Sequence, residues 1–233
     1  MKNIKTSLVS TILFSSQKMR ITIMMSLFIA VFGSLFSVVN PMGAVPVFLA
    51  MTPDYTQQER NHAARNTSIY FVLILTAFFL AGSSILGFFG VSLDALRIAG
   101  GLMILSSGYA LSSGKFAESR AVNKKVKEEA LEKEDISFAP MAMPLLSGPG
   151  SISLLISMFA EHTDWTSRGV IASVIVFTGL SVYFILRVSP SLFKFFGVAG
   201  IKAISRIMGF IVMALGVQYI ITGITGLVTY LTA

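Results

Sequence analysis

Long apolar runs separated by short polar segments are the dominant pattern along this chain of 233 residues. Six of these runs are each long enough to cross about 30 Å of hydrocarbon at about 1.5 Å per residue. They lie at roughly 27–51, 67–89, 96–113, 138–160, 169–187 and 207–231. The pattern therefore predicts an all-α, polytopic membrane protein with six transmembrane helices.

Proline and glycine interrupt the first and fourth runs near their midpoints. The interruptions read Asn40-Pro41-Met42-Gly43 and Ser147-Gly148-Pro149-Gly150. Proline lacks an amide donor and glycine loosens a helix, so the freed backbone groups need partners from protein or from a polar cavity, because lipid offers none. Paired interruptions in corresponding segments indicate a substrate site in a secondary transporter. We therefore predict that helices 1 and 4 are broken.

A sequence repeat relates the two halves of the chain. Phe88-Phe89-Gly90-Val91 matches Phe195-Phe196-Gly197-Val198, and an Arg-Ile-x-Gly sequence follows each, at Arg97 and Arg206. One register thus relates runs 1–3 to runs 4–6, and an odd number of spans per unit makes the repeat inverted. We predict repeats at 26–113 and 137–233, an N-terminal extension at 1–25 and a charged cytoplasmic linker at 114–136. Chance similarity among apolar sequences is the alternative.

The composition excludes several classes of function. The chain is 54% hydrophobic and 12% charged, and it has no cysteine, which excludes disulfides, thiolate metal sites and cysteine nucleophiles. It carries no motif of a metal site, a cofactor site or an enzyme, so we expect neither catalysis nor a cofactor. The net charge of +7 arises from basic residues between the apolar runs, where membrane topology requires them. We therefore expect no nucleic-acid partner.

The distribution of basic residues predicts the orientation in the membrane. Twelve of the 18 Lys and Arg residues lie in the loops 1–2, 3–4 and 5–6, which places these loops in the cytoplasm and both termini in the periplasm. Lys2, Lys5, Lys18 and Arg20 oppose this assignment. No small-residue cleavage site follows them, so we interpret residues 1–25 as an interfacial amphipathic segment or as the result of a start assigned too early.

The two interruptions also suggest the chemistry of the site. Pro41 and Pro149 are suited to begin half-helices, whose free amides and positive dipole ends attract anions. Gly43, Gly148 and Gly150 leave the backbone open, and Asn40, Ser147 and Ser151 offer side-chain hydrogen bonds. No Lys or Arg lies near either break, so a small zwitterionic amino acid fits better than a dianion. The alternative is that both breaks are kinks or re-entrant turns that only shape the fold.

Charged residues and glycines at the ends of the runs have other roles. All eleven acidic residues lie in loops or at segment ends, so facilitated diffusion and an unusual symport both remain open. Arg97 and Arg206 begin runs 3 and 6, an unfavourable helix end for a cation, so each needs a partner, and Asp94 is a candidate for Arg97. They are either interfacial anchors or gates.

Glycines spaced seven apart in these runs indicate close helix packing, and a homo-oligomer is possible.

The two interrupted segments resemble the signature motifs of the MarC family of six-span bacterial inner-membrane proteins. The resemblance rests on the sequences from Asn40 to Phe48 and from Pro144 to Ile152, and it extends from about residue 25 to the C-terminus. That family is similar to the LysE-type amino-acid exporters, and an archaeal member is regarded as a transporter of glycine and alanine. The resemblance implies binding or gating roles for the motif positions, which are Asn40, Pro41, Gly43, Pro46, Ser147, Gly148, Pro149, Gly150 and Ser151.

The sequence therefore predicts a transporter of small neutral amino acids that works by alternating access around the two breaks. Two other classes of protein compete with this interpretation. One is a channel whose re-entrant turns form a selectivity constriction. The other is a membrane scaffold that transports nothing.

Overall fold

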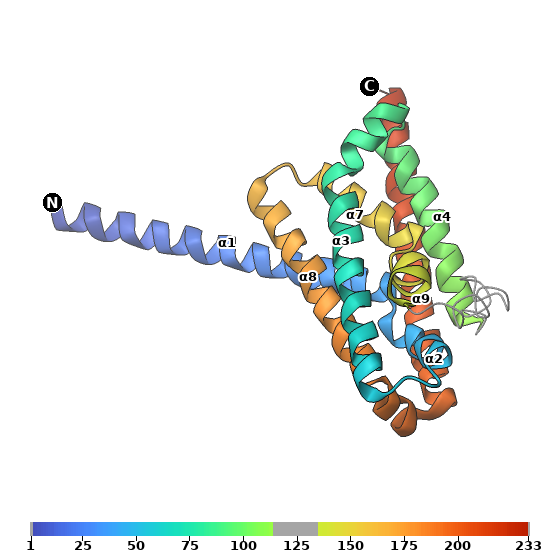
Figure 1. Cartoon of the computed structure of the whole chain (residues 1–233). Coiled ribbons are helices and arrows are strands. Elements are labelled where there is room, and N and C mark those ends of the chain that lie inside the picture. Colours follow the sequence, from blue (N-terminus) through green and yellow to red (C-terminus); the bar gives the residue numbers. More distant parts are fainter. Residues whose placement is uncertain (1, 114–134, 233) are drawn as a thin grey trace.

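A computed structural model of the chain describes residues 2–113 and 135–232. Its elements are α1 (Lys2–Val39), α2 (Pro41–Met51), α3 (Gln57–Phe89), α4 (Leu93–Ser112), the irregular helical segment η1 (Ser137–Leu146), α7 (Pro149–Glu161), α8 (Trp165–Arg187) and α9 (Ser189–Thr232) (Figure 1). No strand occurs within these ranges, so the all-α fold class is confirmed. Most of the predicted linker at 114–136 lies outside the described residues, and the boundaries of the two repeats stay predictions.

The six predicted runs correspond to the long apolar helices of the structure. Five spans are long and apolar enough to cross a membrane, and the first of them, Lys18–Met51, contains the α1–α2 break. The bent pair η1 and α7, with an angle of 66° between its parts, supplies a sixth. Helices 1 and 4 are thus the broken ones, as the sequence predicts.

The helices extend further than the apolar runs suggested. α3 begins at Gln57 and not near residue 67, because Thr56 and Glu59 form a capping box in which the Glu59 carboxylate accepts from the Thr56 amide at 2.7 Å. α9 begins at Ser189, in the predicted loop 5–6. α1 continues without a break through the predicted extension, and its first part projects from the bundle in Figure 1. Polar caps and helix-forming residues outside the apolar runs account for these differences.

Many contacts between elements recur when the two halves of the chain are exchanged. α7 packs on α3 and α4, whereas its counterpart α2 packs on α8 and α9. In the same way, η1 packs on α3, and its counterpart α1 packs on α8. The pairs α3–α8 and α4–α9 join equivalent helices of the two halves. An exchange of the halves therefore reproduces these contacts, and the inverted arrangement of the repeat stays a prediction.

The repeated Phe-Phe-Gly-Val sequence places a glycine with positive φ at the same position in both copies, but the two glycines differ in ψ, which is 22° at Gly90 and -179° at Gly197. Gly90 has a φ of 65° and Gly197 a φ of 62°, and within the described ranges they are the two glycines with positive φ. The preceding phenylalanines form edge-to-face pairs in both copies, with ring centroids 5.2 Å apart in the first and 4.9 Å in the second. A positive φ favours glycine, so both copies require glycine at this position although the chain turns differently after it. Gly90 ends α3, whereas Gly197 interrupts α9.

Glycines bring the backbones of α4 and α9 into contact. A β-carbon at Gly101 would lie 2.8 Å from the carbonyl oxygen of Gly216, and one at Gly209 would lie 2.8 Å from that of Gly108. The two helices therefore approach more closely than any larger residue permits. In lipid, where apolar side chains gain little from leaving the solvent, this close packing holds helices together. The predicted packing role of the glycine stripes agrees with this contact.

We expect Gly108→Ala to lower the thermal stability of the protein in detergent. The added β-carbon would lie 2.6 Å from the backbone nitrogen of Met213, which cannot move without the whole helix, and such overpacking costs about 1–3 kcal/mol. Gly33→Ala is the matched control, since a β-carbon there meets nothing within 4 Å and alanine favours the helix. Equal melting temperatures for the two variants would contradict the close contact.

Candidate functional site

Asn40 forms the first break. It has a left-handed backbone, with φ 47° and ψ 66°, and it is the non-glycine residue with positive φ in the described part of the chain. Its Oδ1 accepts a hydrogen bond from the amide of Gly43 at 3.3 Å, and Pro41 follows as the first residue of α2. Asparagine tolerates this conformation better than most residues and is also a good N-cap. The half-helix start at Pro41 is therefore observed.

The second break is wider than the sequence indicated. α7 starts at Pro149 after Gly148, which offers no side-chain cap, and the Ser151 hydroxyl donates to the Gly148 carbonyl oxygen at 2.8 Å. The irregularity begins earlier, because the backbone is extended at Ala139 and Met143. The sequence analysis named only the interruption from Ser147 to Gly150, so this earlier irregularity was missed. Pro140 and Pro144, which directly follow these two residues, were the signal in the sequence.

The two breaks lie next to each other in the structure. A β-carbon at Gly150, in the first turn of α7, would lie 3.5 Å from Cγ1 of Val38, two residues before Asn40. Asn40 and Ser147 are each 1% exposed, and neither the Asn40 Nδ2 nor the Ser147 Oγ has a hydrogen-bond partner among the described residues. Buried polar atoms without partners are uncommon, because each one costs free energy. These two atoms therefore need an explanation.

A cavity of about 370 Å³ opens beside the second break. Its lining comes from α4, η1 and α7, and from Ser147 between η1 and α7. The lining residues are Leu96, Ala99, Gly100, Met103, Met143, Pro144, Ser147, Pro149, Ile152, Ser153 and Ile156. Of the predicted site residues, Ser147 and Pro149 line it. Asn40, Pro41, Gly43, Gly148, Gly150 and Ser151 are buried and do not line it. The structure thus brings the breaks together but places the cavity on one of them.

Sequence reasoning missed two residues that shape this cavity. Gly100 of α4 faces Ser153 of α7 so closely that a β-carbon would overlap the serine side chain. The Ser153 hydroxyl in turn donates to the carbonyl oxygen of Leu96 at 3.3 Å. Gly100 belongs to the Arg-Ile-x-Gly repeat that the sequence showed, but its partner on α7 depends on the packing of the two helices.

Arg97 joins α4 to α7 at one end of the cavity. Its Nη1 lies 2.7 Å from Oδ1 of Asp94, and its Nη2 lies 2.8 Å from Oε1 of Glu161. The prediction that Arg97 has a partner in Asp94 is confirmed, whereas Glu161 was missed because it lies 64 residues away along the chain. Arg206 is exposed on α9, and Pro46 lies inside α2. The gating roles of Arg97, Arg206 and Pro46 stay predictions.

The loop after α7 is closed by polar contacts. The Arg168 side chain donates to the carbonyl oxygen of His162 at 2.8 Å, near the end of α7. The Asp164 carboxylate accepts from the amide of Ser167 at 2.7 Å, and this hydrogen bond lowers the pKa of the Asp164 carboxyl. Both contacts order the chain between the cavity-lining helix α7 and α8. They fix the end of α7 that carries Glu161.

Comparison with known proteins supplies the family. Residues 25–228 match the family described as "MarC family integral membrane protein". The chain belongs to the MarC family. It is 40% identical over 199 residues to a UPF0056 membrane protein of Methanocaldococcus jannaschii, covering 85% of this chain and 96% of that protein. No solved structure matches the chain.

Bacterial relatives extend this MarC similarity. The UPF0056 membrane protein YhcE of Escherichia coli is 36% identical over 84% of this chain and 91% of its own length. The UPF0056 membrane protein YvbG of Bacillus subtilis is 35% identical over 90% of this chain and its whole length. The printed names describe membrane proteins and name no substrate. The chain is therefore an integral, multi-pass membrane protein of the MarC family, and its activity must be argued from the site.

Replacement of Asn40 tests the left-handed break. We expect Asn40→Ala to lower the free energy of unfolding by about 2–3 kcal/mol, because alanine loses the cap and pays for left-handed backbone. Asn40→Gly loses only the side-chain cap, and replacement of a capping asparagine by glycine lowers stability by only about a few tenths of a kcal/mol. Thermal unfolding in detergent measures both. The same loss in the two variants would show that backbone strain at this position does not matter.

Proposed function

We propose that this MarC-family protein carries a small neutral amino acid across the bacterial inner membrane by alternating access. The observation that carries the proposal is the pair of unpartnered buried groups, Asn40 Nδ2 and Ser147 Oγ, at two adjacent helix starts. A ligand with both hydrogen-bond donors and acceptors would satisfy them when the site opens. The proposal places the structure in a closed state, with these groups shielded from water and lipid.

The start of α7 favours a carboxylate. Its capping residue Gly148 has no side chain, so the amides of the first turn carry the positive end of the helix dipole without competition from a side chain. Ser147 lines the cavity directly before this start and adds a hydroxyl donor. A carboxylate bound here would resemble the anion sites at other helix N-termini. This supports a substrate with one carboxylate.

The charge and size of the cavity restrict the rest of the substrate. None of the described residues that line it is ionisable, so a ligand with net charge would lack a counter-ion among them in a low-dielectric site. A zwitterion has no net charge, and its ammonium group can donate to serine oxygens and to carbonyls released at the breaks. The volume of about 370 Å³ is at the low end for ligand pockets and suits a small side chain. Glycine and alanine are therefore the substrates of choice for a first test.

Movement between two states would use contacts that the structure already contains. Arg97 and Glu161 connect the two helices that line the cavity, so separation of this pair would open one end. The bare glycine contact between α4 and α9 would let one helix slide along the other. With both termini in the periplasm, as the distribution of basic residues predicts, the Arg97 end faces the periplasm.

Uptake into proteoliposomes tests the proposed function. We expect saturable uptake of labelled alanine or glycine by the wild type. Ser147→Ala should lower this uptake about fivefold or more, because it removes a hydrogen bond to the substrate worth roughly 1 kcal/mol. Ser189→Ala is the matched control, because the Ser189 hydroxyl is also buried without a partner but lies at the α8–α9 junction. Imposed proton and sodium gradients identify any coupling ion.

Two outcomes of this assay would contradict the proposal. Flux that never saturates and shows no counterflow would favour a channel. No flux of any small amino acid through a correctly folded protein would favour a scaffold.

Cross-linking tests the opening at Arg97. The chain has no cysteine, so Arg97→Cys with Glu161→Cys introduces the two reactive thiols of an otherwise thiol-free protein. We expect a short bis-methanethiosulfonate, which forms a disulfide with each thiol and releases methanesulfinate, to lower uptake at least tenfold relative to the same variant before cross-linking, and a reductant that cleaves these disulfides to restore it. The control pair is Tyr183→Cys with Arg187→Cys, whose native Arg187 Nη1 and Tyr183 hydroxyl oxygen are 3.1 Å apart. Both residues lie within α8, so their cross-link does not connect α8 to another helix. Unchanged uptake in the cross-linked Arg97–Glu161 pair would exclude it as a gate.

A further inference from the structure

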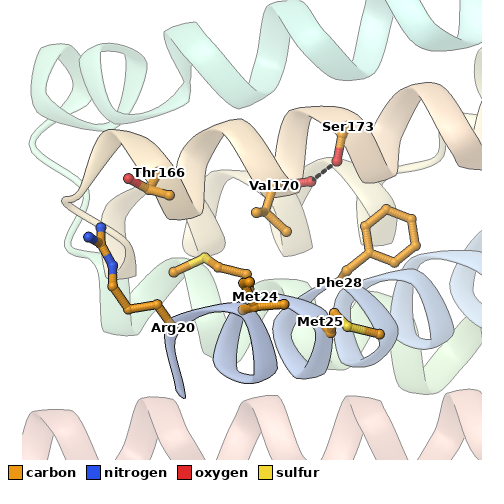
Figure 2. Close-up of a pocket in the computed structure, with 8 residues that line it drawn as sticks. Arg20, Met24, Met25, Phe28, Thr166, Val170 and Ser173 are labelled. Atoms are coloured by element: carbon orange, nitrogen blue, oxygen red, sulfur yellow. Dashed lines mark hydrogen bonds between the residues drawn. The ribbon is translucent and has the colours of Figure 1, made fainter. Parts of the chain in front are cut away.

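A second hollow, far from the breaks along α1, lies between α1 and α8. The two helices meet where Phe177 contacts Phe28 and Phe32, with ring centroids 5.7 and 5.2 Å apart. On the side of this contact toward the start of α8, a groove of about 460 Å³ separates them (Figure 2). Its lining consists of Arg20, Ile21, Met24, Met25, Phe28, Thr166, Val170 and Ser173. The groove includes part of the predicted N-terminal extension, to which the proposed transport assigns no role.

The groove is polar at one end and apolar along its length. Figure 2 shows Arg20 and Thr166 together at one end, and Met24, Met25, Val170 and Phe28 following along the two helices. The Ser173 hydroxyl donates to the carbonyl oxygen of Val170 at 2.6 Å, so its proton is already used. Arg20 is exposed, and within the described ranges no carboxylate pairs with it. The Arg20 cation and the Thr166 hydroxyl thus lie at one end of an otherwise mainly apolar groove.

The position of the groove matches one leaflet of the bilayer. The two membrane spans that form it begin at Lys18 and Trp165, so Arg20 and Thr166 lie near the ends of their spans. Trp165 is 77% exposed beside them, and tryptophan concentrates at the membrane–water interface. From Arg20 to Phe28 the helix rises about 12 Å, compared with about 15 Å for half of the hydrocarbon core. The charged end therefore lies at headgroup depth and the apolar part within the acyl chains.

We infer that this groove binds one anionic phospholipid. Its phosphate would accept hydrogen bonds from the Arg20 guanidinium and the Thr166 hydroxyl, because arginine pairs strongly with phosphate. One acyl chain would lie against Met24, Phe28 and Val170. A bound lipid would fill the groove and connect the projecting part of α1 to α8. The inference does not depend on which substrate the protein carries.

The protein contains its own reporter for this test. Trp165 is the one tryptophan of the chain and precedes Thr166 at the charged end of the groove. The purified full-length protein is reconstituted in phosphatidylcholine vesicles that contain increasing fractions of brominated phosphatidylglycerol or, separately, brominated phosphatidylcholine. We expect the anionic lipid to reach half-maximal quenching at an about fivefold lower mole fraction, the preference that one basic residue near the surface supports.

Charge variants show whether Arg20 causes the preference. We expect Arg20→Gln to make the two brominated lipids quench at equal mole fractions. Lys18→Gln is the matched control, because Lys18 is an exposed cation two residues earlier on α1 that does not line the groove. It removes the same charge and should keep the preference. Equal quenching in the wild type, or an equal loss in both variants, would overturn a specific headgroup site.

Shape variants test the acyl-chain part of the groove. Ser173→Phe fills the groove with a ring, and we expect it to lower the apparent affinity for the anionic lipid at least threefold. Val176→Phe is the control, since Val176 is 49% exposed on the same helix and outside the groove. Unchanged affinity in Ser173→Phe would place the lipid elsewhere. Shielding of Trp165 from both lipids as protein density rises would assign the groove to a second copy of the chain and overturn the inference.

Discussion

The requirement that every backbone polar group finds a partner inside the membrane governs this structure. Continuous helices satisfy it within themselves. The breaks at Asn40 and before Pro149 leave amides and carbonyls without helical hydrogen bonds, and lipid offers no partners for them. The first break is satisfied by the Asn40 side chain, which caps α2, whereas the second has no side-chain cap. Most residues of both breaks are therefore buried between neighbouring helices, and Pro149 is the exposed exception. The first-turn amides of α7 lack a side-chain cap, and they can therefore bind a polar ligand.

Burial of two breaks in one small bundle demands close helix approach, and glycine supplies it. The α4–α9 contact passes backbone against backbone at Gly101, Gly108, Gly209 and Gly216. Gly100 then lets α7 pack beside α4 and positions the cavity. The α4 helix thus presents glycine to two neighbours at once. The Arg97 ion pairs connect the start of α4 to the end of α7, and so they place no charge in the middle of these helices.

Much of the fold was predictable because its signals are local. Apolar runs of sufficient length define spans, Pro and Gly within them define breaks, and the Phe-Phe-Gly-Val repeat marks the two glycines with positive φ in the described residues, Gly90 and Gly197. The partner Asp94 of Arg97 was also predictable, since it lies one helical turn away. Helix ends were less accurate, because the capping box at Thr56 extends α3 beyond its apolar run. The early irregularity of η1 is also local, because Pro140 and Pro144 each follow a residue with extended backbone.

The sequence by itself determined the membrane class, the apolar spans and the positions of both breaks, since each follows from residue types within one segment. Only the tertiary structure decided that Glu161 meets Arg97, that Ser153 faces Gly100, and that the cavity lies on the second break and not between the two. It also decided that α1 and α8 leave a groove beside Arg20. These features join residues far apart along the chain, and their positions depend on how closely side chains of particular sizes let the helices pack.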